Sequence, residues 1–349
     1  MLGIVALSLA CTASMSSQAG DSPRPLIERL PAGAAAIAWV DFAALIEATP
    51  PEKWAEYERM LQDDEDLRRF EAVTGIDPRA DLHGMGVAIV PGDGPREEVI
   101  ALISVDHDRE RLDALLVGAE TLEHGGVVIY STDEVGSRYA EAAAAAGMAA
   151  PDVDSETSAD DDDPAYLALL DGGTVAIGTL AGLQAVIDVE GGGREALAAD
   201  AAMSDRIAEV AGYGQTWMVA TRSAWDDRMA DLDAGGAGAM VPSNAIERIE
   251  TVTLAMRYAD GISMRMTGIT GTPEDAALLA ESLNGWIAMA KMMVQASEPE
   301  LFAIFDSAVR AGHDDRTVHI EIALTEADVE VLQRRIEKQM GNAAAETRR

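Results

Sequence analysis

Two segments in the C-terminal half of the sequence alternate apolar and polar residues with the period of a β-strand. Residues 252–258 read Val-Thr-Leu-Ala-Met-Arg-Tyr and residues 262–267 read Ile-Ser-Met-Arg-Met-Thr. Because successive side chains of a strand point to opposite faces, each segment would bury one face and leave the other in water, which is typical of antiparallel sheets. Ala-Asp-Gly at 259–261 predicts a tight hairpin between the two segments, and Asp-Gly-Gly at 171–173 predicts a second hairpin.

Other strand candidates lead directly into predicted helices. Asp41 stands between an apolar run and a predicted helical stretch that begins at Phe42, and Asp106 and Asp108 are candidate N-caps of the helix that starts at Arg109. Thr272 and Thr325 each precede an acid three residues on, which is the pattern of a capped helix start. The last two helices carry single apolar stripes at helical spacing: Leu279, Leu283, Trp286, Ala290 and Met293 in one, and Val329, Leu332, Ile336 and Met340 in the other. We therefore predict an α+β fold of antiparallel sheets with helices packed on one face.

The strand and helix pattern occurs twice along the chain. This predicts an internal duplication of a strand-helix-strand-strand-helix unit. A stretch with many acids and no base interrupts the first copy, and its self-repulsion opposes compact folding. The predicted organisation is a signal segment at 1–10, a flexible tether at 11–24, a first α+β repeat at 25–190 with an acidic disordered insertion at about 140–163, a second α+β repeat at 191–340 and a frayed tail at 341–349.

The charge of the chain argues against one class of partner. Its 61 acidic residues outnumber 26 lysines and arginines, which gives a formal net charge of −35. Nucleic-acid binding requires basic side chains to neutralise phosphates, so we expect no nucleic-acid partner. The same field repels anionic lipid headgroups, so the protein surface has little electrostatic reason to bind a membrane by itself.

The N-terminus holds the single cysteine of the chain. Leu2–Ala10 is an uncharged, mostly apolar run that is shorter than the roughly 20 residues needed to span a bilayer, and Cys11 follows it directly. The segment resembles the bacterial lipoprotein signal, although Ser8 stands where that signal prefers leucine and no basic residue precedes the run. The resemblance implies lipidation at Cys11 and a membrane-anchored position in the cell envelope, facing the periplasm or the exterior. The alternatives are an ordinary signal cleaved after a nearby alanine and a cytoplasmic chain.

Short blocks in the first half are similar to a group of uncharacterised bacterial envelope proteins. The similarity implies export and an α+β architecture that opens with a strand followed by a helix, and it transfers no catalytic residue. The blocks are Leu30-Pro31-Ala32-Gly33-Ala34, Trp39-Val40-Asp41 with Leu45, Thr74-Gly75-Ile76-Asp77-Pro78 and Asp81-Leu82.

Several acidic and histidine-containing groups resemble metal sites on first reading. The tract 152–163 offers carboxylates to calcium, but it lacks the ligand spacing and turn glycine of an EF-hand loop, so a solvated loop is expected. Asp-His-Asp at 106–108 and His-Asp-Asp at 313–315 fall at predicted element boundaries, where aspartate caps helices and makes turns. The remaining histidines, His83, His124 and His319, form no metal-ligand spacing.

A group of three methionines is the last candidate site. Met289, Met292 and Met293 could form a copper(I) site or an adaptable binding groove, but no histidine or cysteine accompanies them, so we expect core filling. The sequence contains neither the Gly-x-Ser-x-Gly nucleophile elbow nor a phosphate-binding P-loop. It therefore predicts no catalytic, metal or cofactor-binding residue.

These observations favour an exported, lipid-anchored envelope protein that acts as a non-enzymatic binding or scaffold component. Its membrane partner would be reached through the anchor, and a protein partner or an apolar ligand is left unidentified. Two alternatives stay open. One is a periplasmic carrier of an apolar ligand or lipid, held between sheet and helices. The other is a hydrolase with a pair of acids whose pKa values are raised in one cleft.

Overall fold

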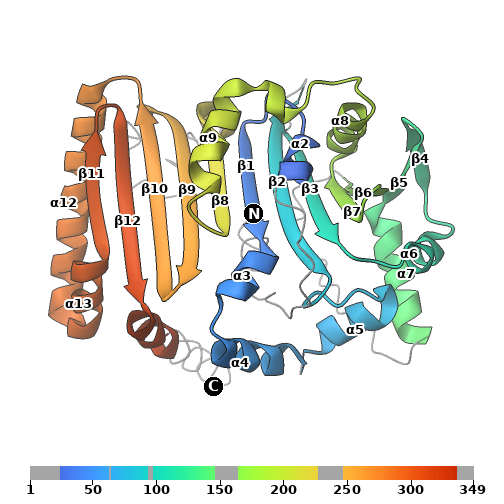
Figure 1. The fold of residues 1–349 in the computed structure, drawn as a ribbon, viewed down its shortest axis with the longest axis horizontal. Coiled ribbons are helices and arrows are strands. Elements are labelled where there is room, and N and C mark those ends of the chain that lie inside the picture. Colours follow the sequence, from blue (N-terminus) through green and yellow to red (C-terminus); the bar gives the residue numbers. More distant parts are fainter. Residues whose placement is uncertain (1–23, 63, 93–96, 146–163, 227–246, 336–349) are drawn as a thin grey trace, which may run out of the picture. The chain divides into compact units, whose positions relative to one another are not determined.

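The computed structural model describes residues 24–62, 64–92, 97–145, 164–226 and 247–335. The chain divides into two compact units, Met1–Arg206 (unit 1) and Ile207–Arg349 (unit 2). Each unit combines antiparallel strands with helices (Figure 1), which confirms the predicted α+β class. None of the helices in the described ranges is long and apolar enough to cross a bilayer.

Unit 1 contains seven described strands in the order β1-β2-β3-β7-β6-β5-β4, with antiparallel neighbours. Most of its helices lie between consecutive strands. The elements are α2 (Arg24–Glu28), β1 (Ala36–Asp41), α3 (Phe42–Ala48), α4 (Pro51–Gln62), α5 (Glu65–Thr74), β2 (Leu82–Pro91), β3 (Glu97–Val105), α6 (Arg109–Leu116), β4 (Thr121–His124), β5 (Val127–Ser131), α7 (Thr132–Ala145), β6 (Tyr166–Leu170), β7 (Thr174–Gly178), α8 (Leu180–Glu190), the 3-10 turn η1 (Leu197–Ala199) and α9 (Ala201–Ala211), which crosses into unit 2.

Unit 2 contains five described strands in the order β8-β9-β10-β12-β11, again antiparallel. The first five strands of unit 1 follow the same plan, β1-β2-β3-β7-β6. This shared order is the topology that an internal duplication predicts. The elements are β8 (Thr216–Thr221), the 3-10 turn η2 (Arg222–Ala224), β9 (Ile249–Ala259), β10 (Gly261–Thr270), α12 (Pro273–Ser297), α13 (Pro299–Ala308), β11 (Val309–Asp314), β12 (Thr317–Thr325) and a helix from Glu326 whose described part ends at residue 335.

Side-chain caps fix several helix starts at the predicted positions. Asp41 accepts the Ala44 N–H at 2.8 Å at the start of α3, and Asp108 caps α6. Thr272 caps α12 and is followed by a proline at the first helical position. The prediction of a cap at Asp106 is wrong, because the carboxylate of Asp106 pairs with the His83 ring at 3.1 Å.

The strands at the centre of unit 1 are buried on both faces. On one face, Val105 packs with Leu112 of α6 and with partly buried side chains of α5 and α7. On the other face, Ile100 is fully buried beside α8. A Cβ on Gly182 of α8 would lie 2.8 Å from the Ile100 side chain, so only glycine permits this approach. Unit 1 therefore has a second helical layer in addition to the one predicted.

The core of unit 2 lies between α12 and the strands β10, β11 and β12. Ala276, Leu279 and Ala280 of α12 are buried and cluster with Val318 of β12. Leu283 packs against this cluster and is half-buried. The predicted inner stripe of α12 is therefore confirmed at Leu279 and Leu283. The prediction that Met293 continues this stripe is wrong, because 63% of that residue is exposed.

Candidate functional site

A polar hollow of about 280 Å³ opens in unit 1, where β3 ends beside the β6–β7 hairpin. Its charged lining comes from Asp106, His107, Arg109 and Asp171, and its floor includes the glycines of the hairpin turn. Because acidic and basic side chains line the same hollow, it is a candidate for a binding or catalytic site.

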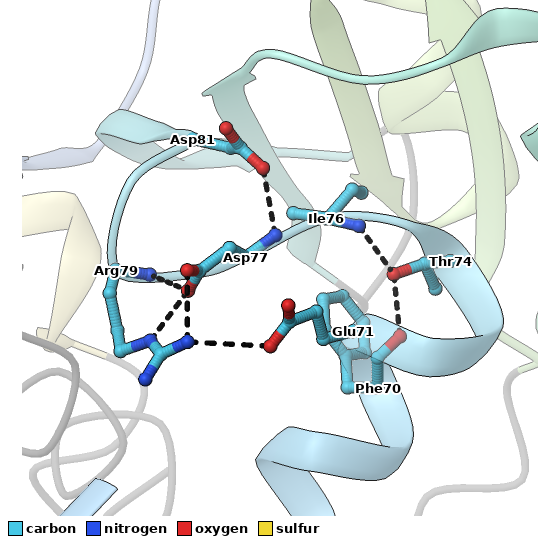
Figure 2. A network of polar contacts seen from close by, with 7 residues as sticks. All are labelled: Phe70, Glu71, Thr74, Ile76, Asp77, Arg79 and Asp81. Carbon is cyan, nitrogen blue, oxygen red and sulfur yellow. Dashed lines mark hydrogen bonds and ion pairs between the residues drawn. The ribbon is translucent and has the colours of Figure 1, made fainter. Parts of the chain in front are cut away.

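A loop between α5 and β2 lies next to the segment that lines this hollow, since its Asp81 carbonyl accepts the Asp106 N–H, and Figure 2 shows the polar contacts within the loop. The loop begins at Gly75, whose φ of +76° ends α5 in the left-handed conformation that glycine favours. The Thr74 hydroxyl donates to the Phe70 carbonyl at 2.7 Å and accepts the Ile76 N–H at 3.1 Å. This local bonding fixes the path of the chain out of the helix.

An aspartate–arginine pair closes the same loop. Figure 2 shows Arg79 turned toward Asp77, with the Arg79 Nε 2.7 Å from the Asp77 Oδ1 and the guanidinium also 3.4 Å from Glu71. The Asp77 N–H in turn donates to the Asp81 carboxylate at 2.7 Å. Burial acts to raise the pKa of Asp77, but hydrogen bonds from Arg79 outweigh it, so the pKa lies below its usual value.

The loop is joined to the hollow through the backbone. Asp106 donates its N–H to the Asp81 carbonyl at 2.9 Å. Its neighbour Val105 donates to the Gly173 carbonyl, also at 2.9 Å. The two bonds join residues 105–106 to the Thr74–Asp81 loop and to the hairpin turn, so the loop helps to position Asp106, which lines the hollow.

Arg29 contacts the β6–β7 hairpin through its guanidinium group. Its Nη1 donates to the Asp171 carbonyl at 3.0 Å and to the Thr174 hydroxyl at 3.1 Å, and it lies 3.1 Å from the Glu190 carboxylate. Burial raises the pKa of Glu190, Arg29 opposes that effect, and the nearby charge of Asp171 adds to it. Arg29 is thus an organising contact for residues far from it in sequence.

Three charged groups of the hollow contact the backbone or residues outside the lining. The Asp106 carboxylate lies 3.1 Å from the His83 ring, and the His107 Nδ1 lies 3.0 Å from the Val105 carbonyl. Arg109 pairs with Asp113 one turn along α6, at 3.0 Å. The described part of the chain contains no group of three or more acids, histidines or cysteines arranged to hold a metal ion. The hollow therefore offers a polar surface on which these three groups already have local contacts.

The other histidine candidates also have structural surroundings. The His124 Nε2 lies 2.7 Å from the Asp188 carboxylate, which joins β4 to α8. His313 and Asp314 end β11, and Asp315 occupies the turn before β12 with a φ of +46°. The predicted turn role is confirmed for Asp315, whereas His313 and Asp314 are paired residues at the end of β11.

A second hollow, of about 480 Å³, lies in unit 2 between the start of α13 and the last described helix. It is lined by Glu298, Pro299, Glu300 and Arg335, and Arg335 forms an ion pair with Glu298. Both hollows are lined mainly by charged and polar groups, so neither has the apolar lining expected of a lipid carrier.

The acids with raised pKa values do not form a catalytic pair. Burial raises the pKa of Asp41, although the backbone hydrogen bond from Ala44 opposes it. Asp41 caps α3, and Glu190 pairs with Arg29. Neither lines one of the two hollows, so these two acids do not supply the paired carboxylates of the hydrolase alternative.

The three methionines of α12 do not fill the core. Met289, Met292 and Met293 are 40%, 65% and 63% exposed, so the prediction of core filling is wrong. Leu278, which sequence reasoning missed, is exposed on the same helix. The signal was available in the helical spacing: Leu278 lies eleven residues before Met289, which places both residues on one side of a 3.6-residue helix.

Three of the predicted features fall outside the described residues. They are Cys11 with the signal and most of the tether, the acidic tract 152–163 and the tail 341–349. Lipidation at Cys11 and an envelope location remain predictions.

No protein-family model and no curated protein matches the chain. Among solved structures, the chain is similar to one titled "Structure of crystal form III of TP0453", with 7% identity and a TM-score of 0.41 over 88% of this chain and 96% of that chain. The residues of the chain itself therefore have to carry a functional assignment.

Proposed function

We propose that this chain is an exported protein, tethered to a membrane of the cell envelope by a lipid on Cys11, that acts as a non-enzymatic binding or scaffold component. The tether rests on the apolar run Leu2–Ala10 and on Cys11 as the only thiol. Several acyl chains hold a protein on a bilayer more firmly than one chain does, and the bacterial lipoprotein signal implies that modification.

The binding role rests on one observation, the exposed apolar side chains of α12. Leu278 and the three methionines gather on one helix of unit 2. Contiguous exposed apolar surface costs free energy in water, and in folded proteins it often marks an interaction site. By contrast, three charged groups of the hollow in unit 1 contact neighbouring side chains or the backbone, which fits a structural use.

Cell fractionation tests the tether. The full-length protein is expressed with Cys11 intact, with Cys11→Ala, and with the control substitution Thr12→Ala. We expect the parent and Thr12→Ala in the membrane fraction and Cys11→Ala in the soluble fraction, because only that variant lacks the lipid acceptor. Membrane partitioning of Cys11→Ala equal to that of the parent would refute the anchor.

Native mass spectrometry distinguishes the proposed binding or scaffold role from that of a periplasmic lipid carrier. The full-length Cys11→Ala protein is purified without detergent, so that no added amphiphile occupies apolar surface. We expect the mass of the chain alone. A co-purifying lipid of defined mass, retained in a fixed ratio, would instead favour the periplasmic carrier.

A further inference from the structure

Helix α12 is apolar on two opposite sides. With about 100° between successive residues, Ala276, Leu279, Ala280 and Leu283 face the strands on one side. On the other side, a second stripe lies within an arc of about 100°. We call this second stripe the α12 outer face, and it consists of Leu278, Met289, Met292 and Met293.

A helix that only packs on its own sheet needs one apolar stripe and keeps its other side polar. The outer face of α12 breaks this rule at Leu278 and again at the three methionines, while Glu281, Ser282 and Gly285 occupy the turns between them. The two apolar ends are roughly 22 Å apart at 1.5 Å per residue. A second helix of about four turns lying along α12 would reach both ends.

The side chains of the outer face suit a partner that packs closely. Methionine is unbranched and flexible, so it adapts its shape to the apolar face of another helix. Between Leu278 and Met289 the same side of α12 carries Gly285, where an added Cβ would meet nothing within 4 Å. A partner helix can approach the backbone there without displacing a side chain.

The charges around the outer face select the sign of the partner. Glu274 and Glu281 are exposed on the same side of α12, and no described lysine or arginine forms an ion pair with either. Lys291, the only basic residue of this helix, is held by Asp306 at 2.9 Å. The rim is thus acidic on a chain of net charge −35, which disfavours a second copy of this chain or an anionic bilayer and favours a cation.

We propose that the α12 outer face binds a basic amphipathic helix of another protein. The apolar stripe of that helix would cover Leu278 and the three methionines, and its lysines or arginines would lie beside Glu274 and Glu281. Helix-in-groove recognition of this kind combines apolar anchors at helical spacing with charges at the rim. The proposal rests on the proposed binding function and names the chemistry of its partner.

Fluorescence anisotropy tests the proposal on the full-length Cys11→Ala protein. The probe is an 18-residue dye-labelled peptide of leucine, lysine and arginine with one apolar face. A second peptide keeps the leucines and replaces every base by glutamate. We expect saturable 1:1 binding of the basic peptide and at least about tenfold weaker binding of the acidic one, because electrostatic complementarity selects the partner.

Matched variants locate the site. Met292→Ser with Met293→Ser should raise the Kd of the basic peptide about tenfold or more, because a few apolar anchors carry most of the binding energy of such interfaces. Glu281→Lys should raise it severalfold. Met60→Ser is the control, because Met60 is 66% exposed and lies on α4 of unit 1, and this variant should bind like the parent. Circular dichroism melts verify that every variant is folded.

Three results would overturn the proposal. The first is equal binding by the Met292→Ser/Met293→Ser variant and the parent, which would mean that the acids of the chain attract the peptide without the outer face. The second is concentration-dependent dimerisation abolished by the same substitutions, which would assign the face to a second copy. The third is binding of phosphatidylcholine vesicles, but not of the peptide, through these methionines. None of them would alter the fractionation result for Cys11→Ala, so the tether and the partner are tested separately.

Discussion

The Thr74–Asp81 loop of unit 1 and the α12 outer face of unit 2 both lie at the protein surface, but they differ in which side chains they expose to water. In the loop the charged groups bond to nearby partners. Asp77 accepts hydrogen bonds from Arg79, and the Asp81 carboxylate accepts the Asp77 N–H. The outer face turns Met292 and Met293 outward. The hydrogen bonds of the loop are made within the loop itself. The outer face leaves apolar side chains exposed, and burying them against a partner would be favourable.

The two units share the order of five strands, so the sheet does not explain this contrast. The difference arises in the segments that connect the strands. The Thr74–Asp81 loop belongs to the connection between β1 and β2, and α12 belongs to the connection between β10 and β11. One sheet plan thus carries a self-contained polar surface in one unit and an apolar surface in the other.

The largest expected effect separates the two sides of α12. Leu279→Ala should lower the free energy of unfolding by about 3 kcal/mol, because it leaves a cavity in the core of unit 2. Leu278→Ala, one residue away and 52% exposed, should change it by less than about 0.5 kcal/mol. Urea unfolding of both variants measures the difference, and equal losses would show that the outer face is covered within the chain.

The next largest effect is expected at Arg29 in unit 1. Arg29→Met keeps the aliphatic stem but removes the bonds to Asp171 and Thr174 and the ion pair with Glu190. We expect a loss of about 2 kcal/mol, because partly buried acceptors lose a charged donor. Arg68→Met is the control, since the Arg68 ion pair with Glu65 is exposed. A loss no greater than that of the control, read from thermal melts, would contradict the organising role of Arg29.

A smaller, pH-dependent effect is expected at Asp77. Asp77→Asn should cost about 1 kcal/mol at pH 7, because Asp77 accepts charged hydrogen bonds from Arg79. The folded protein lowers the pKa of Asp77, so the stabilisation is fully present above the unfolded-state pKa of 3.8 and is lost as pH falls through the lower folded-state value. The gap between parent and variant, followed by urea unfolding from pH 7 down to pH 3, should therefore narrow below about pH 4. A gap that widens toward acid would contradict this sign.

The smallest expected effect on stability belongs to the methionines that matter most for the proposed partner. Met292→Ser with Met293→Ser should change the free energy of unfolding by less than about 0.5 kcal/mol, because both residues are more than 60% exposed. A loss above about 2 kcal/mol in urea unfolding would mean that these residues stabilise the fold itself.

Local features of the fold could be predicted from the sequence. The caps at Asp41, Asp108 and Thr272 follow from side-chain bonds that reach only two or three residues along the chain. The β9–β10 hairpin is predictable for the same reason, since Gly261 adopts a φ of +131° at its turn.

Non-local pairing could not be predicted. Strand β3 pairs with β7, about 70 residues later, instead of with the nearer β4, and nothing in a local pattern fixes that choice. Burial of β3 on both faces likewise depends on non-local packing, with α6 against one face and α8 against the other. The methionines of α12 were misread because periodicity shows that a stripe exists but does not show which of two stripes meets the sheet.

The contacts of Arg29 have a consequence for the order in which the protein can assemble. Arg29 meets Thr174, 145 residues farther along the chain, and the Leu30 carbonyl accepts the Leu197 N–H at 2.7 Å. The ribosome delivers Arg29 and Leu30 early, yet their partners emerge only after most of unit 1 has followed. Closing so long a loop is entropically costly. The segment that holds Arg29 and Leu30 is therefore expected to gain these neighbours late, and a truncation before Thr174 would leave it without them.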